Sequence, residues 1–341
     1  MTKNSMLART KIVAGASLLL TFVLICGGAC NRTPAGGSAG GAATPAPSFV
    51  KLGFVTNNTS EFWKIAGAGI HKYEKEAKVQ VDLKLPASGT AESQNQILQD
   101  LASQGYAGIA VSAIAPNDQV PLLDKIAEKT NLITFDSDAP KSKRLLYIGT
   151  DNYEAGKVLG GRIVTLLPKG GKIAVFVGTF AADNAAQRFK GIADVVAGHN
   201  IEIIDKREDN TDRAKARSNV EDLVNAHHDL ALVVGLYNYN GPAIAAALDG
   251  LGKKGKVLAA VFDEDDGTLD GIESGAIQAT VVQKPFMFGY LASKWMHELA
   301  TKGEAAKAAI PPSHSIDTGV DLIDKSNVAG FKAKLAELKR S

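Results

Sequence analysis

Short runs of hydrophobic residues alternate with amphipathic segments along the chain from about residue 49 onward. The runs are rich in β-branched residues and apolar at nearly every position, a pattern that predicts parallel strands covered on both faces. In the segments between them, apolar residues recur at helical spacing. We expect strands at 50–56, 79–85, 108–113, 132–137, 172–178, 201–209, 230–237, 257–263 and 277–283.

This alternation of strands and helices occurs twice. The first series ends at a polar stretch around Thr150 and Asp151, and a second series follows it. Two such series predict an α/β fold of two lobes, each built on a doubly wound parallel sheet. If the helix that begins at Pro285 packed on the first sheet, the chain would cross between the lobes again and form a multi-strand hinge. We expect the N-terminal lobe at 49–150 plus 284–312, the C-terminal lobe at 151–283 plus 313–322, and a C-terminal helix or tail at 323–341.

The N-terminal segment follows a different pattern. Lys3, Arg9 and Lys11 precede an uncharged apolar run from Ile12 to Ile25, which is the order of charges and apolar residues in an export signal. The run is shorter than the roughly 20 residues that a bilayer-spanning helix needs. We therefore expect a signal peptide at 1–29 and a mature protein in the periplasm or cell envelope.

Both cysteines of the chain, Cys26 and Cys30, lie in or beside this export segment. Small residues lead to Cys30, and a tract rich in Gly, Ala, Pro and Ser follows it. This arrangement resembles a bacterial lipoprotein signal, with Cys30 as the lipidated residue and a flexible tether at 30–48 that anchors the protein to a membrane. Gly27 stands where that signal usually has an aliphatic residue, so simple signal cleavage is the alternative. We expect neither a disulfide nor a thiol site in the folded part.

Composition narrows the possible functions. The length of 341 residues and the 45% hydrophobic content allow a sizeable core and favour two domains. The 38 basic and 36 acidic residues are mixed along the chain and give a net charge of +2. Since no basic stripe is present, we do not expect nucleic acid as a partner.

Polar and aromatic residues follow the first expected strand in the stretch "TNNTSEFW", 56–63. A dinucleotide-binding enzyme would need glycines at this turn to admit a pyrophosphate, and the stretch contains none. Hydroxyl and amide groups followed by Phe62 and Trp63 suit a neutral polyol with one apolar face. The alternative is a polar helix cap followed by two core aromatics.

Other expected strands also end in hydrogen-bonding side chains. The carboxyl ends of parallel strands form the rim of the ligand crevice in an open α/β sheet, so these side chains should converge. Carboxylates can accept from two hydroxyls at once. The set lacks a nucleophile, base and acid combination, and we therefore expect binding rather than catalysis. The strand-end residues are Asp136, Tyr237, Asn238, Asp263 and Gln283.

The acidic run "DEDD", 263–266, invites a metal site. Loops that bind hard cations place their ligands at spaced positions around a glycine turn, whereas this run is contiguous. A strand-end acid followed by acids at a helix N-terminus explains it better. We expect neither a metal nor a cofactor.

The order and spacing of six motifs resemble those of the type I periplasmic binding proteins of the ribose-binding group, over about residues 49–322. This resemblance implies a two-lobed, monomeric solute receptor with three crossings between its lobes, which delivers its solute to the permease of an ABC importer. The motifs are "FVTNNTSEFW", "LITFDSDAP", "YIGTDNYEAGKVLG", "AADNAAQRFKGI", "AVFDEDDG" and "ATVVQKP".

The resemblance also implies a set of ligand-binding residues. Phe62 and Trp63 would form a stacking pair around the sugar ring, and Asp136 would accept from ring hydroxyls. For Arg188 a structural role is the alternative. The full set is Ser60, Phe62, Trp63 and Asp136 on the first lobe, with Asn184, Arg188, Asn238, Asp263 and Gln283 on the second.

Two departures from the family pattern bear on the ligand. Pentose-binding members commonly carry arginines where this chain has Ser137 and Ala186. Losing both forked donors changes the hydroxyl pattern that the site can satisfy, so ribose is doubtful and another simple sugar or polyol is expected. Asp138 is either a compensating acceptor or a solvated loop acid.

We therefore expect reversible capture of a simple sugar or polyol and its delivery to an ABC permease by hinge closure. The alternative is a ligand-sensing subunit for a membrane receptor or kinase. An exported enzyme would need a nucleophile or a cofactor loop at a strand end, and we find neither.

Overall fold

The computed structural model describes residues 50–60 and 62–340. The expected signal peptide, Cys30 and the tether lie outside the described residues. Among the helices that are described, none combines the length and apolar character required to cross a bilayer.

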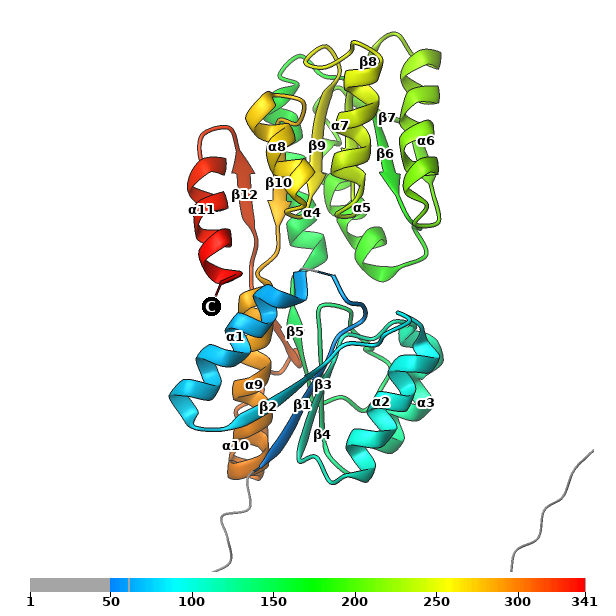
Figure 1. Cartoon of the computed structure of the whole chain (residues 1–341). Coiled ribbons are helices and arrows are strands. Elements are labelled where there is room, and N and C mark those ends of the chain that lie inside the picture. The colour runs from blue at the N-terminus through cyan, green and yellow to red at the C-terminus, as the bar shows by residue number, and fades with distance from the viewer. Residues whose placement is uncertain (1–49, 61, 341) are drawn as a thin grey trace, which may run out of the picture. The chain divides into compact units, whose positions relative to one another are not determined.

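The first sheet has six strands in the order β11-β5-β4-β3-β1-β2, all parallel. Helices α1 and α9 cover one of its faces, and α2 and α3 cover the other (Figure 1). The short helix α10 follows α9. The strands are β1 (Lys51–Val55), β2 (Gln80–Lys84), β3 (Gly108–Val111), β4 (Asn131–Phe135), β5 (Leu146–Gly149) and β11 (Ser315–Asp317), and the helices are α1 (Phe62–Ala77), α2 (Ala91–Ser103), α3 (Pro116–Ala127), α9 (Pro285–Lys302) and α10 (Glu304–Ala308).

The second sheet repeats this plan in the order β12-β10-β9-β8-β6-β7, with only β12 antiparallel to its neighbour. Helices α4 and α5 pack on one face, while α6, α7, α8 and α11 pack on the other. The strands are β6 (Gly171–Val177), β7 (Ile201–Glu208), β8 (Leu230–Gly235), β9 (Leu258–Phe262), β10 (Ala279–Val282) and β12 (Asp321–Asp324), and the helices are α4 (Asn152–Leu166), α5 (Asp183–Val196), α6 (Arg213–Ala226), α7 (Asn240–Gly250), α8 (Asp266–Ser274) and α11 (Val328–Leu338).

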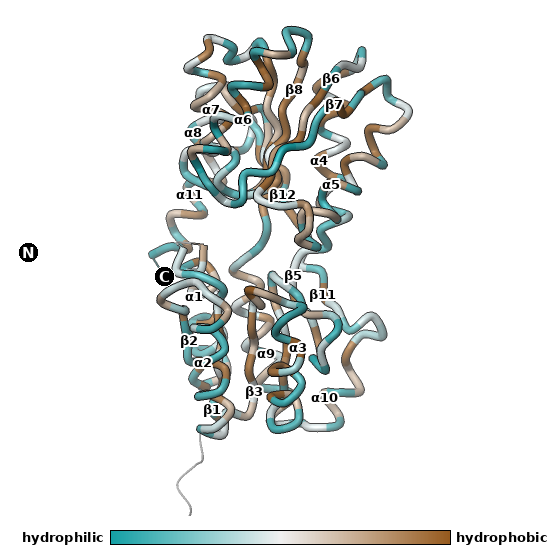
Figure 2. Tube along the Cα trace, turned by 90° about the vertical axis from the view of Figure 1, so that its right-hand side faces the viewer, coloured by the Kyte–Doolittle hydropathy of each residue, from teal (hydrophilic) through white to brown (hydrophobic). Residues whose placement is uncertain are grey.

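Position in the sheet decides how hydrophobic each strand is. The central strand β8 is almost entirely buried, whereas the edge strand β7 consists of exposed and half-buried residues. Figure 2 shows hydrophobic colouring along β8, whereas the charged second half of β7 is coloured hydrophilic. The long apolar runs of the sequence therefore correspond to strands that are covered by helices on both faces.

The expected class, two doubly wound parallel sheets in an α/β fold, is confirmed. Three short strands, β5, β11 and β12, were not predicted. The pairing of β11 with β5 puts residues 315–317 in the first sheet, although the sequence analysis placed 313–317 in the second lobe. The chain next joins the second sheet at Asp321, so the third crossing between the lobes lies at 318–320.

Each lobe contains one pair of helices whose backbones touch at glycines. A Cβ atom on Gly289 of α9 would lie 1.9 Å from the Ala66 carbonyl oxygen of α1, and one on Gly69 would lie 2.0 Å from the Phe286 oxygen. In the second lobe, a Cβ on Gly156 of α4 would lie 2.3 Å from the backbone oxygen of Arg188 on α5. No larger residue fits such an approach without separating the helices.

We expect Gly289→Ala to lower the free energy of unfolding by about 1–3 kcal/mol, because the new methyl group must push α1 away from α9. Gly161→Ala is the matched control, since Gly161 is also helical but a Cβ there meets nothing within 4 Å. The control should gain up to about 1 kcal/mol from better helix propensity. Urea unfolding followed by circular dichroism measures both changes, and equal stability of the two variants would contradict the close packing.

Candidate ligand-binding site

Two aspartates occupy equivalent places at the carboxyl ends of strands. Asp136 follows β4 and Asp263 follows β9, and these strands are third in their respective sheets. Both residues have left-handed backbones, with φ of 55° for Asp136 and 68° for Asp263. A non-glycine residue in this region is uncommon and is often found at functional sites, held there by its surroundings.

The surroundings of the two aspartate backbones follow the same pattern. The N–H of Asp136 donates to the Ile148 oxygen of β5 at 3.2 Å, and the N–H of Asp263 donates to the Val281 oxygen of β10 at 2.8 Å. A hydroxyl from the same neighbouring strand then donates to each aspartate carbonyl. Tyr147 does so for Asp136 at 3.0 Å, and Thr280 does so for Asp263 at 2.7 Å. The neighbouring strand therefore fixes each aspartate from both sides of its backbone.

The carboxylate of Asp136 is oriented by two donors of its own lobe. Its Oδ2 atom accepts from the Ser112 hydroxyl at 2.8 Å and from the Asn57 amide at 3.2 Å. The same Asn57 amide also donates to the Ser112 hydroxyl oxygen at 3.0 Å. No hydrogen bond among the described residues reaches Oδ1. One oxygen is thus committed to the protein, and the other is available to a hydroxyl donor.

The sequence analysis did not select Asn57 and Ser112. Both lie at strand ends, Asn57 two residues after β1 and Ser112 immediately after β3. This position was the available signal, because the ends of β1, β3 and β4 lie at the same edge of the first sheet.

Charges on the second lobe also shift the pKa of the Asp136 carboxyl. Burial raises the pKa of this carboxyl to about 6, against the lowering effects of the Ser112 hydrogen bond, the Arg188 charge and the Asn57 amide. The charge of Asp263 raises the pKa further. Charged groups of the second lobe therefore act on the strand end of the first.

Gln283 and Arg188 accompany Asp263 on the second lobe. The Gln283 amide donates to Asp263 Oδ1 at 3.0 Å, and Arg188 Nη1 lies 3.7 Å from Asp263 Oδ2. Arg188 is only 2% exposed and donates to Asn152 Oδ1 at 2.8 Å and to the Leu236 oxygen at 2.7 Å. These bonds favour the structural alternative for Arg188, and its contact with a ligand stays a prediction.

Asn184 and Asn238 lie at the same end of the second sheet. Asn184 is in the first turn of α5, and its Oδ1 atom accepts from the Tyr237 hydroxyl at 3.3 Å. Asn238 is half-buried in the turn between β8 and α7. The adjacent Asn240 is buried and fixes this turn by accepting from the Tyr237 N–H at 2.9 Å.

The two aromatic residues of α1 differ in exposure. Trp63 is 2% exposed, donates its indole N–H to Asn58 Oδ1 at 3.0 Å and packs edge-on against Phe135. Phe62 is half-buried and meets Trp63 edge to face with ring centroids 4.9 Å apart. Ser60 is exposed, and its N–H donates to Asn58 Oδ1. Trp63 thus offers little surface for stacking, whereas Phe62 keeps some, and the ligand contacts of all three stay predictions.

Asp138 has a structural environment that neither earlier interpretation anticipated. Arg144 binds both of its oxygens, each at 2.6 Å, and the Thr134 hydroxyl and the Ala139 N–H donate to Oδ1. Asp138 is therefore neither a solvated loop acid nor a spare acceptor for a ligand.

The acidic run after β9 also has a structural explanation. Asp265 caps α8 by accepting from the Gly267 N–H at 2.9 Å, and Asp266 lies 3.6 Å from the Lys339 ammonium. Glu264 is 7% exposed, and its Oε2 atom is buried without a hydrogen-bond partner among the described residues. Burial, followed by the charge of Asp263, raises the pKa of Glu264 to about 8. Within residues 50–60 and 62–340, no cluster of His, Cys, Asp and Glu is suited to a metal ion.

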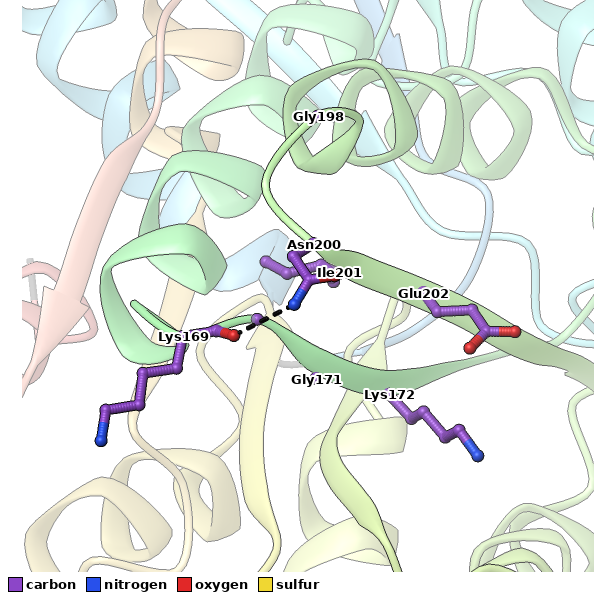
Figure 3. A pocket seen from close by; sticks show the side chains of 8 residues that line it. Lys169, Gly171, Lys172, Gly198, Asn200, Ile201 and Glu202 are labelled. Atoms are coloured by element: carbon purple, nitrogen blue, oxygen red, sulfur yellow. Dashed lines mark hydrogen bonds between the residues drawn. The ribbon is translucent and has the colours of Figure 1, made fainter.

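A hollow on the second lobe lies away from these residues. Lys169, Lys172, Asn200 and Glu202 are among the residues that line it (Figure 3). The hollow is at the amino ends of β6 and β7, whereas Asp263 lies at the carboxyl end of its strand in the same parallel part of the sheet. It is therefore not part of the candidate site.

Comparisons with known proteins agree with this arrangement. A xylose/arabinose-binding protein, XylF of Sulfolobus acidocaldarius, is 26% identical over 96% of this chain and 86% of its own length. The ribose import binding protein RbsB of Bacillus subtilis is 26% identical over 82% of this chain and 90% of its own. An ABC transporter solute-binding protein from Burkholderia graminis, solved with D-arabinose, superposes with a TM-score of 0.75 at 29% identity, covering 82% and 96% of the two chains.

Two α/β lobes with hydrogen-bonding groups at their strand ends are the arrangement expected of a solute-binding protein. The family described as periplasmic binding protein domain matches residues 52–305, and the chain belongs to this family. Within it, the chain is a type I member of the ribose-binding group, which confirms the resemblance noted in the sequence.

The buried Glu264 gives a testable dependence of stability on pH. Between the ordinary glutamate pKa of 4.5 and about 8, the folded protein keeps a proton that the unfolded chain has lost. The free energy of unfolding should therefore fall as the pH rises through this window and level off above it. Glu264→Gln cannot titrate, so we expect it to lose less stability than wild type between pH 5 and pH 8.5 in urea unfolding.

Glu92→Gln is the control for this experiment, because Glu92 is an exposed glutamate in the first turn of α2. It should follow the pH dependence of wild type. If Glu264→Gln did the same, Glu264 would be ionised in the folded protein at neutral pH and the account of its burial would be wrong.

Proposed function

We propose that the protein binds a simple sugar or polyol outside the cytoplasm and delivers it to an ABC importer by hinge closure. The observation that carries the proposal is the pair of strand-end aspartates, Asp136 and Asp263, held in the same way on two separate lobes. Ligand hydroxyls that donate to both would join the lobes and favour the closed form.

The chemistry of the site suits a neutral ligand that is rich in hydroxyls. Asp136 and Asp263 supply acceptors, and the amides of Asn238 and Gln283 can both donate and accept. The donors of Arg188 are engaged by Asn152, by the Leu236 carbonyl and by the Asp263 carboxylate, and the two aspartates disfavour an acidic sugar. Names of relatives point to aldoses, namely xylose or arabinose for one and ribose for another. Ser137 and Ala186 replace the arginines of pentose-binding members, which favours a hydroxyl pattern other than that of ribose.

Polar contacts link the three crossings between the lobes. The carboxylate of Asp317, the last residue of β11 before the third crossing, accepts from the N–H of Asp151 in the first crossing and from that of Gly319 in the third, each at 2.9 Å. The ammonium of Lys284 in the second crossing lies 3.2 Å from the carboxylate of Asp321. Linked crossings favour bending as a unit when the lobes close on a ligand.

Transport is favoured over sensing, because a curated relative is named an import binding protein and another a xylose/arabinose-binding protein. Among similar solved structures, one is described as a complex of XylFII with LytSN, at 25% identity. The absence of catalysis, the signal peptide, the lipid anchor at Cys30 and the monomeric state belong to the same proposal. Of these, the signal peptide and the lipid anchor accord with the extracytoplasmic location typical of the family.

Isothermal titration calorimetry of the purified protein with a panel of pentoses, hexoses and polyols tests the function. We expect at least one panel member to bind, and at 100 times its dissociation constant to stabilise the fold by about 2.7 kcal/mol. Asp136→Asn and Asp263→Asn should each weaken that binding by about tenfold or more, because a charged acceptor is lost. Both variants should stay folded without ligand.

Asp138→Asn is the matched control. It removes the charge of a neighbouring aspartate that Arg144 holds, so it should lower stability without weakening the binding of the sugar. The function would be refuted if no panel member bound wild type. The site assignment would be refuted if Asp136→Asn and Asp263→Asn both bound the sugar as wild type does.

A further inference from the structure

A buried amide network lies behind the ligand-facing edge of the first sheet. Gln94 of α2 is fully buried, and its Nε2 donates to the Thr56 oxygen at 2.8 Å and to the Ser112 oxygen at 2.7 Å. Its Oε1 accepts from the Ile114 N–H at 3.2 Å and from the Gln119 amide at 2.9 Å. Both donors and both acceptor sites of the Gln94 amide are therefore satisfied.

The two carbonyls that Gln94 binds belong to the strand ends that orient Asp136. Thr56 directly precedes Asn57, whose amide donates to Asp136 Oδ2. Ser112 itself carries the hydroxyl that is the second donor to this oxygen. The register of β1 and β3 extends to the pair Val55 and Val111, so both carbonyls lie just beyond the paired residues. Gln94 thus continues the connection between β1 and β3 past the end of their ladder.

We propose that Gln94 is a positioning residue for the ligand-binding carboxylate of Asp136, acting through the ends of β1 and β3. This proposal rests on the proposed function, in which Oδ1 of Asp136 accepts from a ligand hydroxyl. By holding both carbonyls with one amide, Gln94 keeps the Ser112 hydroxyl and the Asn57 amide at hydrogen-bonding distance from Oδ2. The orientation of Oδ1 then follows from that of Oδ2, because the carboxylate is planar.

A change at Gln94 should therefore alter Asp136 in two measurable ways. The Ser112 and Asn57 hydrogen bonds lower the pKa of the Asp136 carboxyl, so displacing these donors should raise it. Displacement should also turn Oδ1 away from its place and weaken ligand binding. A residue that merely stabilised the lobe would have neither effect on Asp136.

Gln119 of α3 provides a matched control. It is 1% exposed and bonds to Gln94 at 2.9 Å, to Asn95 at 2.7 Å and to the Ala115 N–H at 2.9 Å. None of these bonds reaches β1 or Ser112. Its replacement therefore removes a buried amide of the same network without releasing the ends of β1 and β3.

The experiment compares wild type with Gln94→Met and Gln119→Met, since methionine keeps the length of the side chain but has no amide. The pKa of Asp136 in the ligand-free protein is measured by carboxyl ¹³C NMR, with Asp136→Asn used to assign the signal. Affinity is measured by calorimetry with whichever of D-arabinose, D-xylose and D-ribose binds wild type most tightly. If Gln94→Met does not fold, Gln94→Leu takes its place, because leucine also lacks the amide and adds no charge that would itself shift the pKa of Asp136.

We expect the variant at Gln94 to raise the pKa of Asp136 and to weaken sugar binding by about tenfold or more. Gln119→Met should lower stability while leaving the pKa and the affinity as in wild type. The proposal is wrong if the Gln94 variant leaves the pKa of Asp136 unchanged, or if both glutamine variants change it equally. If none of the three sugars binds wild type, the pKa still decides the role of Gln94, and that failure counts against the choice of ligand instead.

Discussion

The proposed ligand-binding site depends on holding an aspartate in a left-handed conformation at the carboxyl end of a strand, once in each lobe. Such a backbone costs on the order of 1–3 kcal/mol at a residue other than glycine, so it persists only where its neighbours fix it. Here the next strand supplies both restraints, a carbonyl that accepts from the aspartate N–H and a hydroxyl that donates to its carbonyl. Tyr147 and Thr280 differ in size, but each donates a hydroxyl hydrogen bond to the backbone carbonyl oxygen of its aspartate.

The rest of the fold supports this arrangement. Apolar strands covered by helices on both faces give each lobe a rigid sheet, and glycine contacts between α1 and α9 and between α4 and α5 leave those helices little room to shift. Since Gly156 touches the backbone of Arg188, helix packing in the second lobe also places the buried guanidinium beside Asp263. Core packing and site geometry are thus connected through named contacts.

Much of this architecture could be predicted from the sequence, because strands buried on both faces are apolar along their whole length. The three strands that were missed are short. β11 and β12 lie at sheet edges and include acidic residues such as Asp317 and Asp324, so they carry no apolar run. The change of sheet at 318–320 could not be seen for the same reason.

Asp136, Asp263 and Gln283 could be selected because a polar residue directly after an apolar strand is conspicuous. Asn57 and Ser112 carried the same strand-end signal, although the sequence analysis did not select them. Tyr147 and Gln94 carried no such signal, because they act through contacts between segments that are distant in sequence, and their side chains look ordinary in their local context. The near-complete burial of Trp63 likewise depends on packing against Phe135, which the stretch "TNNTSEFW" does not reveal.

The most direct test of the account is a crystal structure of the protein with its sugar bound. The account predicts a ring between the ends of β4 and β9, with one hydroxyl donating to Oδ1 of Asp136 and another to the carboxylate of Asp263. A sugar bound elsewhere, or one in contact with only one lobe, would contradict it.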